Sequence, residues 1–269
     1  MVDRTPAESA LAAFALTRAP DLPRWIDTRG MLLSGRASVR APSDSDGSIP
    51  GAIVVVPDSA LVAVAGRPPA HTIADAVAAL SGDVNVLAQM EDADYVGRVL
   101  TGWRRQRAII HVLPGVLPWE AESEPNVRVF TLESAPRFDH VPDMVRRELV
   151  DALRGRTVSR FVPGALPPSG ALASRMTVPM AAAWADGRPV SFCHPVWQTE
   201  TLWDVSIETL EPYRRRGLGA RAARTLIRHM RTTGRAPVWG ALETNSGSRA
   251  LAARLGFLEA GGVAVFTEA

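Results

Sequence analysis

The amino-acid sequence predicts an α/β protein, and three observations lead to this prediction. The chain has 269 residues, 46% of them apolar, so it can bury one large core or two of ordinary size. Short apolar stretches with the spacing of strands alternate with stretches that have helical spacing. The single cysteine, Cys193, cannot form an intramolecular disulfide, so packing alone must stabilise the fold.

The N-terminal part of the chain shows this alternation regularly. A helix is expected from Pro6, because Thr5-Pro6-Ala7-Glu8 is a capping-box pattern with proline in the first turn. Asp44 and Asp46 lie in a loop that lacks the third acidic ligand and the distal glutamate of a calcium site, so no metal is expected there. Further helices are expected near residues 72–80 and 92–102, and strands at residues 52–56, 61–65, 84–87 and 108–112.

A linker is expected at residues 114–125, where proline, glycine and acidic residues cluster. It divides the chain into predicted domains at residues 1–120 and 125–269. In the second domain, Asp186-Gly187 is a hairpin signal between two strand patterns. The expected strands there are residues 127–132, 180–184, 189–193, 201–210, 237–243 and 262–266, and the expected helices run from Pro142 over Leu153, from the turn at Gly219 to about residue 232, and over residues 246–255.

The charge balance excludes several classes of protein. The 30 basic and 28 acidic residues leave a formal net charge of +2, and every basic residue is an arginine. Neither a disordered nor a polycationic chain is therefore expected. No apolar run approaches the roughly 18–20 residues of a membrane helix. Asp3 and Glu8 argue against a secretory signal, so a cytoplasmic protein without a membrane partner is expected.

The segment from Arg214 to Ala220 carries the strongest functional signal. It reads Arg-Arg-Arg-Gly-Leu-Gly-Ala and lies between a predicted strand and a predicted helix. At such a junction the first N–H groups of the helix have no intrahelical acceptor, and the helix dipole adds about half a positive charge. Gly217 and Gly219 allow the backbone to approach a ligand closely. The segment is therefore a candidate phosphate site.

Arginines concentrate around this segment. Between Glu211 and Arg235 there are eight arginines and one acidic residue. The turn arginines are expected to bind phosphate: Arg214, Arg215 and Arg216. The arginines that follow have helical spacing and are expected to form the solvated face of the helix: Arg221, Arg224, Arg228 and Arg231.

A second motif follows at residues 245–257, which read Asn-Ser-Gly-Ser-Arg-Ala-Leu-Ala-Ala-Arg-Leu-Gly-Phe. Together with Arg214-x-x-Gly217-x-Gly219, it resembles the GNAT superfamily of acyl-CoA-dependent N-acetyltransferases. The signature of that family is Arg/Gln-x-x-Gly-x-Gly/Ala, followed by an asparagine, a helix and a terminal Leu-Gly-Phe. The resemblance covers about residues 125–269 and implies a GNAT-like mixed sheet flanked by helices.

The resemblance also implies a co-substrate and its place. Acetyl-CoA is expected, with its pantetheine arm in a V-shaped opening between the strands at residues 201–210 and 237–243. Its diphosphate is expected on backbone N–H groups of the arginine turn, and a dinucleotide fold is not favoured, because no acidic residue that reads a ribose is needed. The implied cofactor-binding residues are Thr209, Arg214, Arg215, Arg216, Gly217, Leu218, Gly219, Ala220, Asn245 and Arg249.

Direct acyl transfer to an amine benefits from a general base. An amine with a pKa near 10 is neutral in only about one part in a thousand at pH 7. On the strand at residues 201–210, Asp204, Ser206 and Glu208 share one face. Glu208 is the first candidate base and Asp204 the second, with Glu200 and Glu243 behind them. The alternative is that these carboxylates only pair with nearby arginines.

One position departs from the family pattern. The family often has a tyrosine four residues before the glycine of the second motif, and this tyrosine reprotonates the leaving thiolate. This chain has Ala252 there, and Tyr95 and Tyr213 are its only tyrosines. The chain is therefore expected either to release the thiolate without that acid, with water or another group in its place, or to bind CoA without turnover.

Other reactive side chains receive a structural interpretation. Cys193 and His194 are neighbours on one strand and point to opposite faces, so they cannot form a nucleophile–base pair. Cys193 is expected to be a buried thiol, whereas His194 is a candidate for the substrate cleft. Trp197 and Trp203 are candidates to border the acceptor pocket, against the alternative that they belong to the core.

Three functions are compared on these grounds. The leading one is an N-acetyltransferase acting on an amine of a small molecule or peptide. The second is a catalytically inactive module that binds CoA, and the third is a nucleic-acid binder that uses the arginine face, which is the least favoured. The N-terminal domain is interpreted as a degenerate copy of the same fold without a CoA site, which shapes the acceptor site or forms an interface, such as that of a homodimer.

Overall fold

The computed structural model describes residues 6–42, 48–115, 117–155 and 178–269. The N-terminal half contains α1 (Pro6–Arg18), α2 (Ile26–Leu33), β1 (Ser38–Arg40), β2 (Gly51–Val56), β3 (Leu61–Gly66), α3 (Ala70–Ala78), β4 (Asn85–Gln89), α4 (Ala93–Val99) and β5 (Arg104–Val112). The C-terminal half contains β6 (Val127–Phe130), α5 (Asp143–Leu153), β7 (Met180–Ala185), β8 (Arg188–Gln198), β9 (Leu202–Thr209), α6 (Leu218–Thr232), β10 (Ala236–Leu242), α7 (Ser246–Arg254) and β11 (Leu258–Thr267).

These elements confirm the predicted alternation, including the hairpin of β7 and β8. The prediction missed two elements, α2 and β1. Most side chains of α2 are buried, so this helix lacks the polar face that marks a helix in a sequence. Strand β1 has only three residues, too few for an alternating pattern. The capping residue Thr5 and the loop with Asp44 lie outside the described residues.

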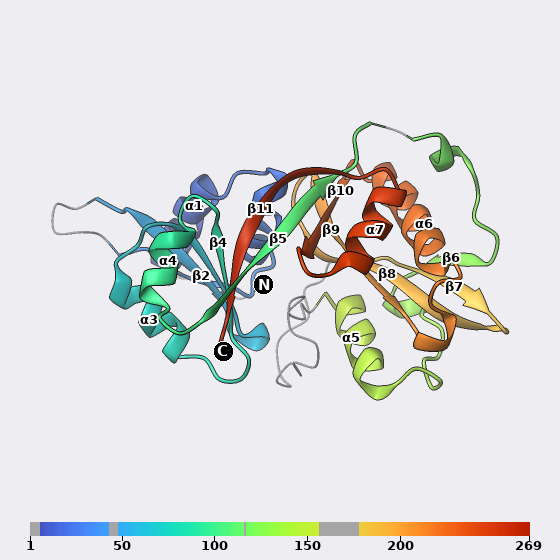
Figure 1. The fold of residues 1–269 in the computed structure, drawn as a ribbon, viewed down its shortest axis with the longest axis horizontal. Helices are drawn as coiled ribbons and strands as arrows, with labels where there is room; N and C mark the ends of the chain where they lie inside the picture. The colour runs from blue at the N-terminus through green and yellow to red at the C-terminus, as the bar shows by residue number, and fades with distance from the viewer. Residues whose placement is uncertain (1–5, 43–47, 116, 156–177) are drawn as a thin grey trace.

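The described strands form one mixed sheet in the order β1-β2-β3-β4-β11-β5-β10-β9-β8-β7-β6. The two parallel pairs are β3 with β4 and β9 with β10. Figure 1 shows α1, α3 and α4 at one end of this sheet and α5, α6 and α7 at the other. The predicted fold class, an α/β protein with helices flanking a mixed sheet, is thereby confirmed. None of the described helices is long and apolar enough to cross a membrane.

The two halves repeat one arrangement and exchange their last strands. Both follow the order strand, helix, strand, helix, strand: β3-α3-β4-α4-β5 and β9-α6-β10-α7-β11. The C-terminal strand β11 lies between β4 and β5, and β5 in turn pairs with β10. The N-terminal half therefore has the strand order of a second copy of the fold, and each half completes the sheet of the other. The predicted domain boundary near residue 120 separates the two repeats along the chain, but one sheet contains the strands of both.

The hydrophobic core has three parts. One lies between α6 and β7–β10 and includes Cys193 and Trp203. A second lies under α3 and α4. The third joins the halves, because α1 and α2 cover residues of both, such as Ala63 from β3, Trp197 from β8 and Val238 from β10. Helices α1 and α2 thus pack on strands of the C-terminal half, including β8 and β10.

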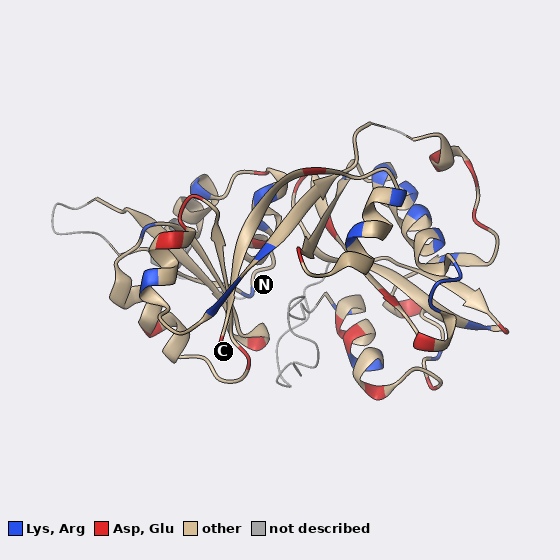
Figure 2. Ribbon diagram, in the orientation of Figure 1, with Lys and Arg blue, Asp and Glu red and all other residues tan. Residues whose placement is uncertain are grey.

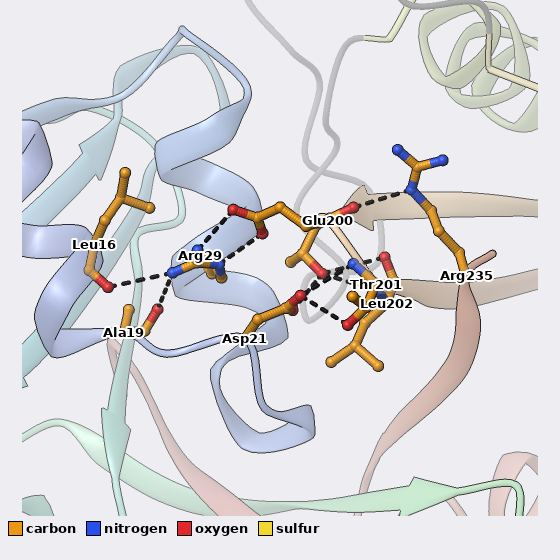
Figure 3. A network of polar contacts seen from close by, with 9 residues as sticks. Leu16, Ala19, Asp21, Arg29, Glu200, Thr201, Leu202 and Arg235 are labelled. Atoms are coloured by element: carbon orange, nitrogen blue, oxygen red, sulfur yellow. Dashed lines mark hydrogen bonds and ion pairs between the residues drawn. The ribbon is translucent and has the colours of Figure 1, made fainter. Parts of the chain in front are cut away.

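Polar contacts strengthen this junction at the turn between β8 and β9 (Figure 3). Asp21 accepts hydrogen bonds from the hydroxyls of Thr199 and Thr201 at 2.6 and 2.7 Å. Arg29 of α2 donates two hydrogen bonds to the carboxylate of Glu200, at 2.8 and 2.6 Å, and a third to the carbonyl of Ala19. The N-terminal segment therefore fixes the start of β9, the strand that carries the candidate base.

Replacing Gly30 by alanine should destabilise this junction. A Cβ at Gly30 would lie 2.5 Å from Cβ of Trp197, and both atoms belong to packed elements. Overpacking of this kind costs roughly 1–3 kcal/mol. Gly97→Ala is the matched control, because Gly97 also lies in a helix and its added Cβ would meet Phe266 at an ordinary 3.5 Å. Thermal unfolding should show a lower Tm for Gly30→Ala only; equal values would contradict the close contact.

Candidate functional site

Strands β9 and β10 separate after a short paired stretch. Their parallel register covers Leu202–Asp204 of β9 and Ala236–Val238 of β10. Beyond it, β9 continues on β8 as far as Thr209, and β10 continues on β5 as far as Leu242. The strands therefore form the V-shaped opening that the family resemblance implies.

The edge of β9 that faces the opening carries backbone polar groups. Leu210 donates its N–H to the carbonyl of Val190 in β8. Along an antiparallel strand the backbone N–H and C=O groups of successive residues point alternately toward and away from the neighbouring strand. Glu208 and Ser206 therefore bond to β8, whereas the backbone groups of Ile207 and Thr209 point toward the opening. The carbonyl of Thr209 accepts from Arg214 Nε at 2.9 Å, and its hydroxyl bonds to Ser191 at 2.7 Å.

The arginine turn lies at the open end of the V. Arg214, Arg215 and Arg216 are exposed, and Arg215 adopts a left-handed conformation with φ of 62°. Among the described residues, no acceptor is assigned to the N–H groups of residues 215–220, and the first such bond is Arg221 N–H to the carbonyl of Gly217. These N–H groups therefore lie at the start of α6 without a backbone acceptor, which is what a phosphate site requires.

The two glycines of the turn have different physical roles. Gly217 has φ of 75°, a conformation that favours glycine, at the N-cap of α6. Gly219 is needed for space, because a Cβ there would lie 3.3 Å from both Ile207 Cγ2 and Thr209 Oγ1. The start of α6 thus lies directly against the part of β9 that borders the opening.

Asn245 and Arg249 lie on the β10 side of the opening. The side-chain oxygen of Asn245 caps α7 by accepting from Ser248 N–H at 3.0 Å. Arg249 donates to the carbonyl of Glu243 at 3.2 Å. Leu251 of α7 would lie 3.7 Å from a Cβ at Gly219, so α7 and the start of α6 approach each other. The two sequence motifs therefore meet at the open V.

Three of the four arginines on the outer face of α6 are partly covered and ion-paired, which corrects the expectation of a solvated face. Arg221 and Arg224 pair with Glu124 at 3.3 and 3.1 Å, and Arg231 pairs with Glu120 at 2.7 Å. Both glutamates come from the linker, which covers this face of α6. Figure 2 shows the repeated basic segments along the helix. The pairing lowers the positive charge of the surface on which the nucleic-acid alternative depends.

Glu208 and Asp204 share one face of β9 but differ in exposure. The side chain of Glu208 is 28% exposed and its carboxylate pairs with Arg214 Nη2 at 3.2 Å. Asp204 is fully buried, at the position where β9 and β10 separate. Glu208 is therefore the carboxylate of this pair that an acceptor can reach from solvent.

Sequence analysis missed a further carboxylate, Glu148. Burial on α5, and to a smaller extent the charge of Glu208, together raise the pKa of Glu148 to about 6. Two carboxyl groups from α5 and β9 therefore share one environment. Glu148 belongs to an amphipathic helix, where a glutamate is usually a surface residue, so only the packing of α5 on the sheet identifies it.

Other candidate bases are occupied by structural contacts. The ion pair with Arg29 lowers the pKa of Glu200, through its hydrogen bond first of all, and favours a permanently charged carboxylate. Glu243 is exposed, with Arg107 3.9 Å away. Trp197 and Trp203 are buried in hydrophobic clusters, as the interpretation of them as core residues predicts.

The remaining reactive side chains follow the structural interpretation. Cys193 is buried, and burial raises the pKa of its thiol far above the usual range. Burial lowers the pKa of His194 to about 4, so its ring is neutral at pH 7. Ala252 is buried in the core, and the hydroxyl of Tyr213 bonds to Asp186 at 3.1 Å. Among the described residues, no group of three or more His, Cys, Asp or Glu side chains is placed to hold a metal ion.

Comparison with known proteins agrees with this geometry. Residues 181–264 match the family model of the GNAT acetyltransferases. No curated protein matches the chain. The matched segment begins in β7 and ends in β11, so it contains both strands of the V, the arginine turn and α7.

Several solved structures share the fold over nearly the whole chain. A GCN5-related N-acetyltransferase-like protein from Streptococcus suis is 15% identical, with a TM-score of 0.65 over 97% of this chain and 99% of its own. A putative GNAT acetyltransferase from Novosphingobium aromaticivorans is 17% identical, with a TM-score of 0.56 over 92% and 96%. A tandem GNAT protein from the clavulanic acid biosynthesis pathway is 12% identical, with a TM-score of 0.55 over 97% and 95%. Residues 181–264 are therefore similar to the GNAT acetyltransferases, and the chain shares the fold of these solved structures.

Proposed function

We propose that this protein is an N-acetyltransferase that moves an acetyl group from acetyl-CoA to an amine of a small molecule or peptide. The observation that carries the proposal is the meeting of an open V between β9 and β10 with the unpartnered N–H groups of residues 215–220. The family match supports acyl transfer as the class of reaction. The partly exposed carboxylate of Glu208 on β9 supports direct transfer to the amine.

The residues of the V fit acetyl-CoA as a co-substrate. The N–H groups of residues 215–220 and the guanidinium groups of the turn would hold the diphosphate, with each charge-assisted hydrogen bond contributing about 1.5–3 kcal/mol. Gly219 keeps that anion close to β9. The backbone groups of Ile207 and Thr209 would align the pantetheine arm, and Arg249 and the amide of Asn245 would lie across the opening. Acetyl-CoA supplies the thioester carbonyl that the amine attacks.

Glu208 has the features of the general base in this reaction. It is reachable from solvent and lies on the strand that borders the thioester path. We assign it the removal of one proton from the acceptor ammonium, directly or through water, so that the neutral nitrogen attacks the carbonyl carbon. The C–N bond forms as the C–S bond breaks, and the proton that the acylated nitrogen then loses passes through water to the leaving thiolate, because Ala252 offers no acid there. Glu208 afterwards returns its own proton to solvent. Asp204, buried deeper in the V, is the second candidate.

The N-terminal repeat lacks both features of the site, which supports one acetyl-CoA per chain. Its parallel strands β3 and β4 pair along Leu61–Val64 and Asn85–Ala88, so only short ends, Ala65–Gly66 and Gln89, extend beyond the ladder and no comparable V opens. The turn before α3 contains Pro68 and Pro69, which have no N–H groups, and Arg67 N–H is bonded to Pro50. We propose that this half supports the strands of the site instead.

Two measurements test the proposed function. Calorimetry of the full chain with acetyl-CoA should give one site per chain, and thiol release should occur with members of a panel of amines. Gly219→Val should abolish binding, because the larger side chain fills the contact with Ile207. Gly97→Ala in α4, where the added Cβ would meet Phe266 at an ordinary 3.5 Å, is the control. Tight binding without thiol release would favour the inactive CoA-binding module.

A further inference from the structure

The guanidinium of Arg214 connects the proposed base to the proposed phosphate site. Arg214 immediately precedes the unpartnered N–H groups of the turn. Its side chain turns back along β9, where Nη2 lies 3.2 Å from Glu208 Oε1 and Nε donates to the carbonyl of Thr209 at 2.9 Å. One side chain therefore bridges the place for the anion and the place for the acid–base step.

Arg214 can exchange its present partner, the carboxylate of Glu208, for another anion. The Arg214 side chain is 57% exposed, and an exposed ion pair contributes little net stability because solvent screens it. A phosphate offers a guanidinium shorter, bidentate hydrogen bonds and more negative charge than one carboxylate. A diphosphate seated on the neighbouring N–H groups therefore competes for Arg214.

We propose that Arg214 is a positioning residue that acts through Glu208: it holds the Glu208 carboxylate until acyl-CoA binds, and then turns to the diphosphate. The inference rests on the proposed function and adds a conformational step to it. Once Arg214 leaves, Glu208 and Glu148 face each other without this neutralising cation, and they attract an acceptor as its ammonium ion.

The charged groups around Glu208 make Glu148 a suitable reporter. From α5 come Glu148 and, one turn further, the buried Asp151; β8 contributes His194, diagonal to Glu208, and β9 itself contributes Asp204. His194 is neutral at pH 7, because burial lowers its pKa to about 4. Among the described residues, Arg214 is the cation paired with Glu208. Withdrawing it should therefore raise the pKa of Glu148 above its value of about 6.

The test is a ¹³C NMR titration of glutamate carboxyl groups in the full chain, with Glu148 assigned by Glu148→Gln. In the wild type, saturating CoA should raise the Glu148 pKa by about half a unit or more. In Arg214→Gln the pKa should be raised already without CoA and should change little when CoA is added. Arg128→Gln, which removes an exposed arginine that stacks on Trp184, is the control for net charge and should behave as the wild type.

Each result decides between the alternatives. If Arg214→Gln shows the same CoA-induced rise as the wild type, the phosphate field alone causes the shift and the inference is overturned. It is also overturned if CoA binds, as calorimetry reports, and the wild-type pKa does not move. Absence of CoA binding would overturn the proposed function together with this inference. If Arg214→Gln binds no CoA, the pKa of Glu148 without CoA still decides the question. A raised Glu148 pKa in Arg214→Gln, with an unchanged one in Arg128→Gln, supports the role of the ion pair. An unchanged Glu148 pKa in Arg214→Gln overturns it.

Discussion

A chain that begins at residue 125 will not form a stable domain on its own. Such a fragment retains the whole family-matched segment, yet β11 loses both neighbours, β4 and β5, and β10 loses β5. It also loses apolar partners of Trp197 and Val238 on α2, β3 and β5. Burial of one large aliphatic or aromatic side chain contributes about 1.5–3 kcal/mol, and a domain has only about 5–15 kcal/mol of net stability. Circular dichroism should therefore show no cooperative unfolding of residues 125–269.

Complementation provides the control for this expectation. Co-expression of residues 1–115 with residues 117–269 breaks the chain in the linker and keeps every strand of the sheet. These fragments should copurify and unfold cooperatively, because the exchanged strands β5 and β11 hold them together. A soluble fragment 125–269 that melts cooperatively and binds acetyl-CoA would show that strand exchange is dispensable.

Replacing Glu208 by glutamine should reduce acetyl transfer by roughly 10²–10⁴-fold, the usual contribution of a general base. The loss should appear in kcat, while calorimetric affinity for acetyl-CoA stays similar, because the amide keeps the size of the side chain. The deficit should shrink as the pH rises toward the pKa of the acceptor amine, since more amine is then neutral without help. Steady-state thiol release from pH 6 to 10 measures this.

Two variants make this result specific to Glu208. Asp204→Asn removes the second candidate; if it loses the pH-dependent activity and Glu208→Gln does not, the assignment of the base is reversed. Glu259→Gln changes an exposed carboxylate on β11 that pairs with Arg107, outside the V, and should leave the rate unchanged. A common loss in all three would indicate a general electrostatic effect instead of a base.

Local sequence was sufficient for most elements and for the position of the arginine turn. The strand before Arg214, the glycines at 217 and 219 and the apolar face of the following helix are all local patterns, and the turn has the predicted position between β9 and α6. Local pattern failed for α2, because a helix buried on most sides has no polar face to reveal it. It also failed for the arginine face of α6, because the glutamates that cover it lie about a hundred residues earlier in the chain.

What the sequence alone determined is therefore the position of two short motifs and the α/β class, because both depend on backbone conformation and on side chains close in the chain. Tertiary structure decided how these parts combine. It placed β11 between β4 and β5, opened the V by ending the β9–β10 ladder at Asp204, and brought Glu148 to Glu208. Each of these depends on contacts between distant segments, which no local pattern encodes, and such contacts set the electrostatic environment of a carboxylate.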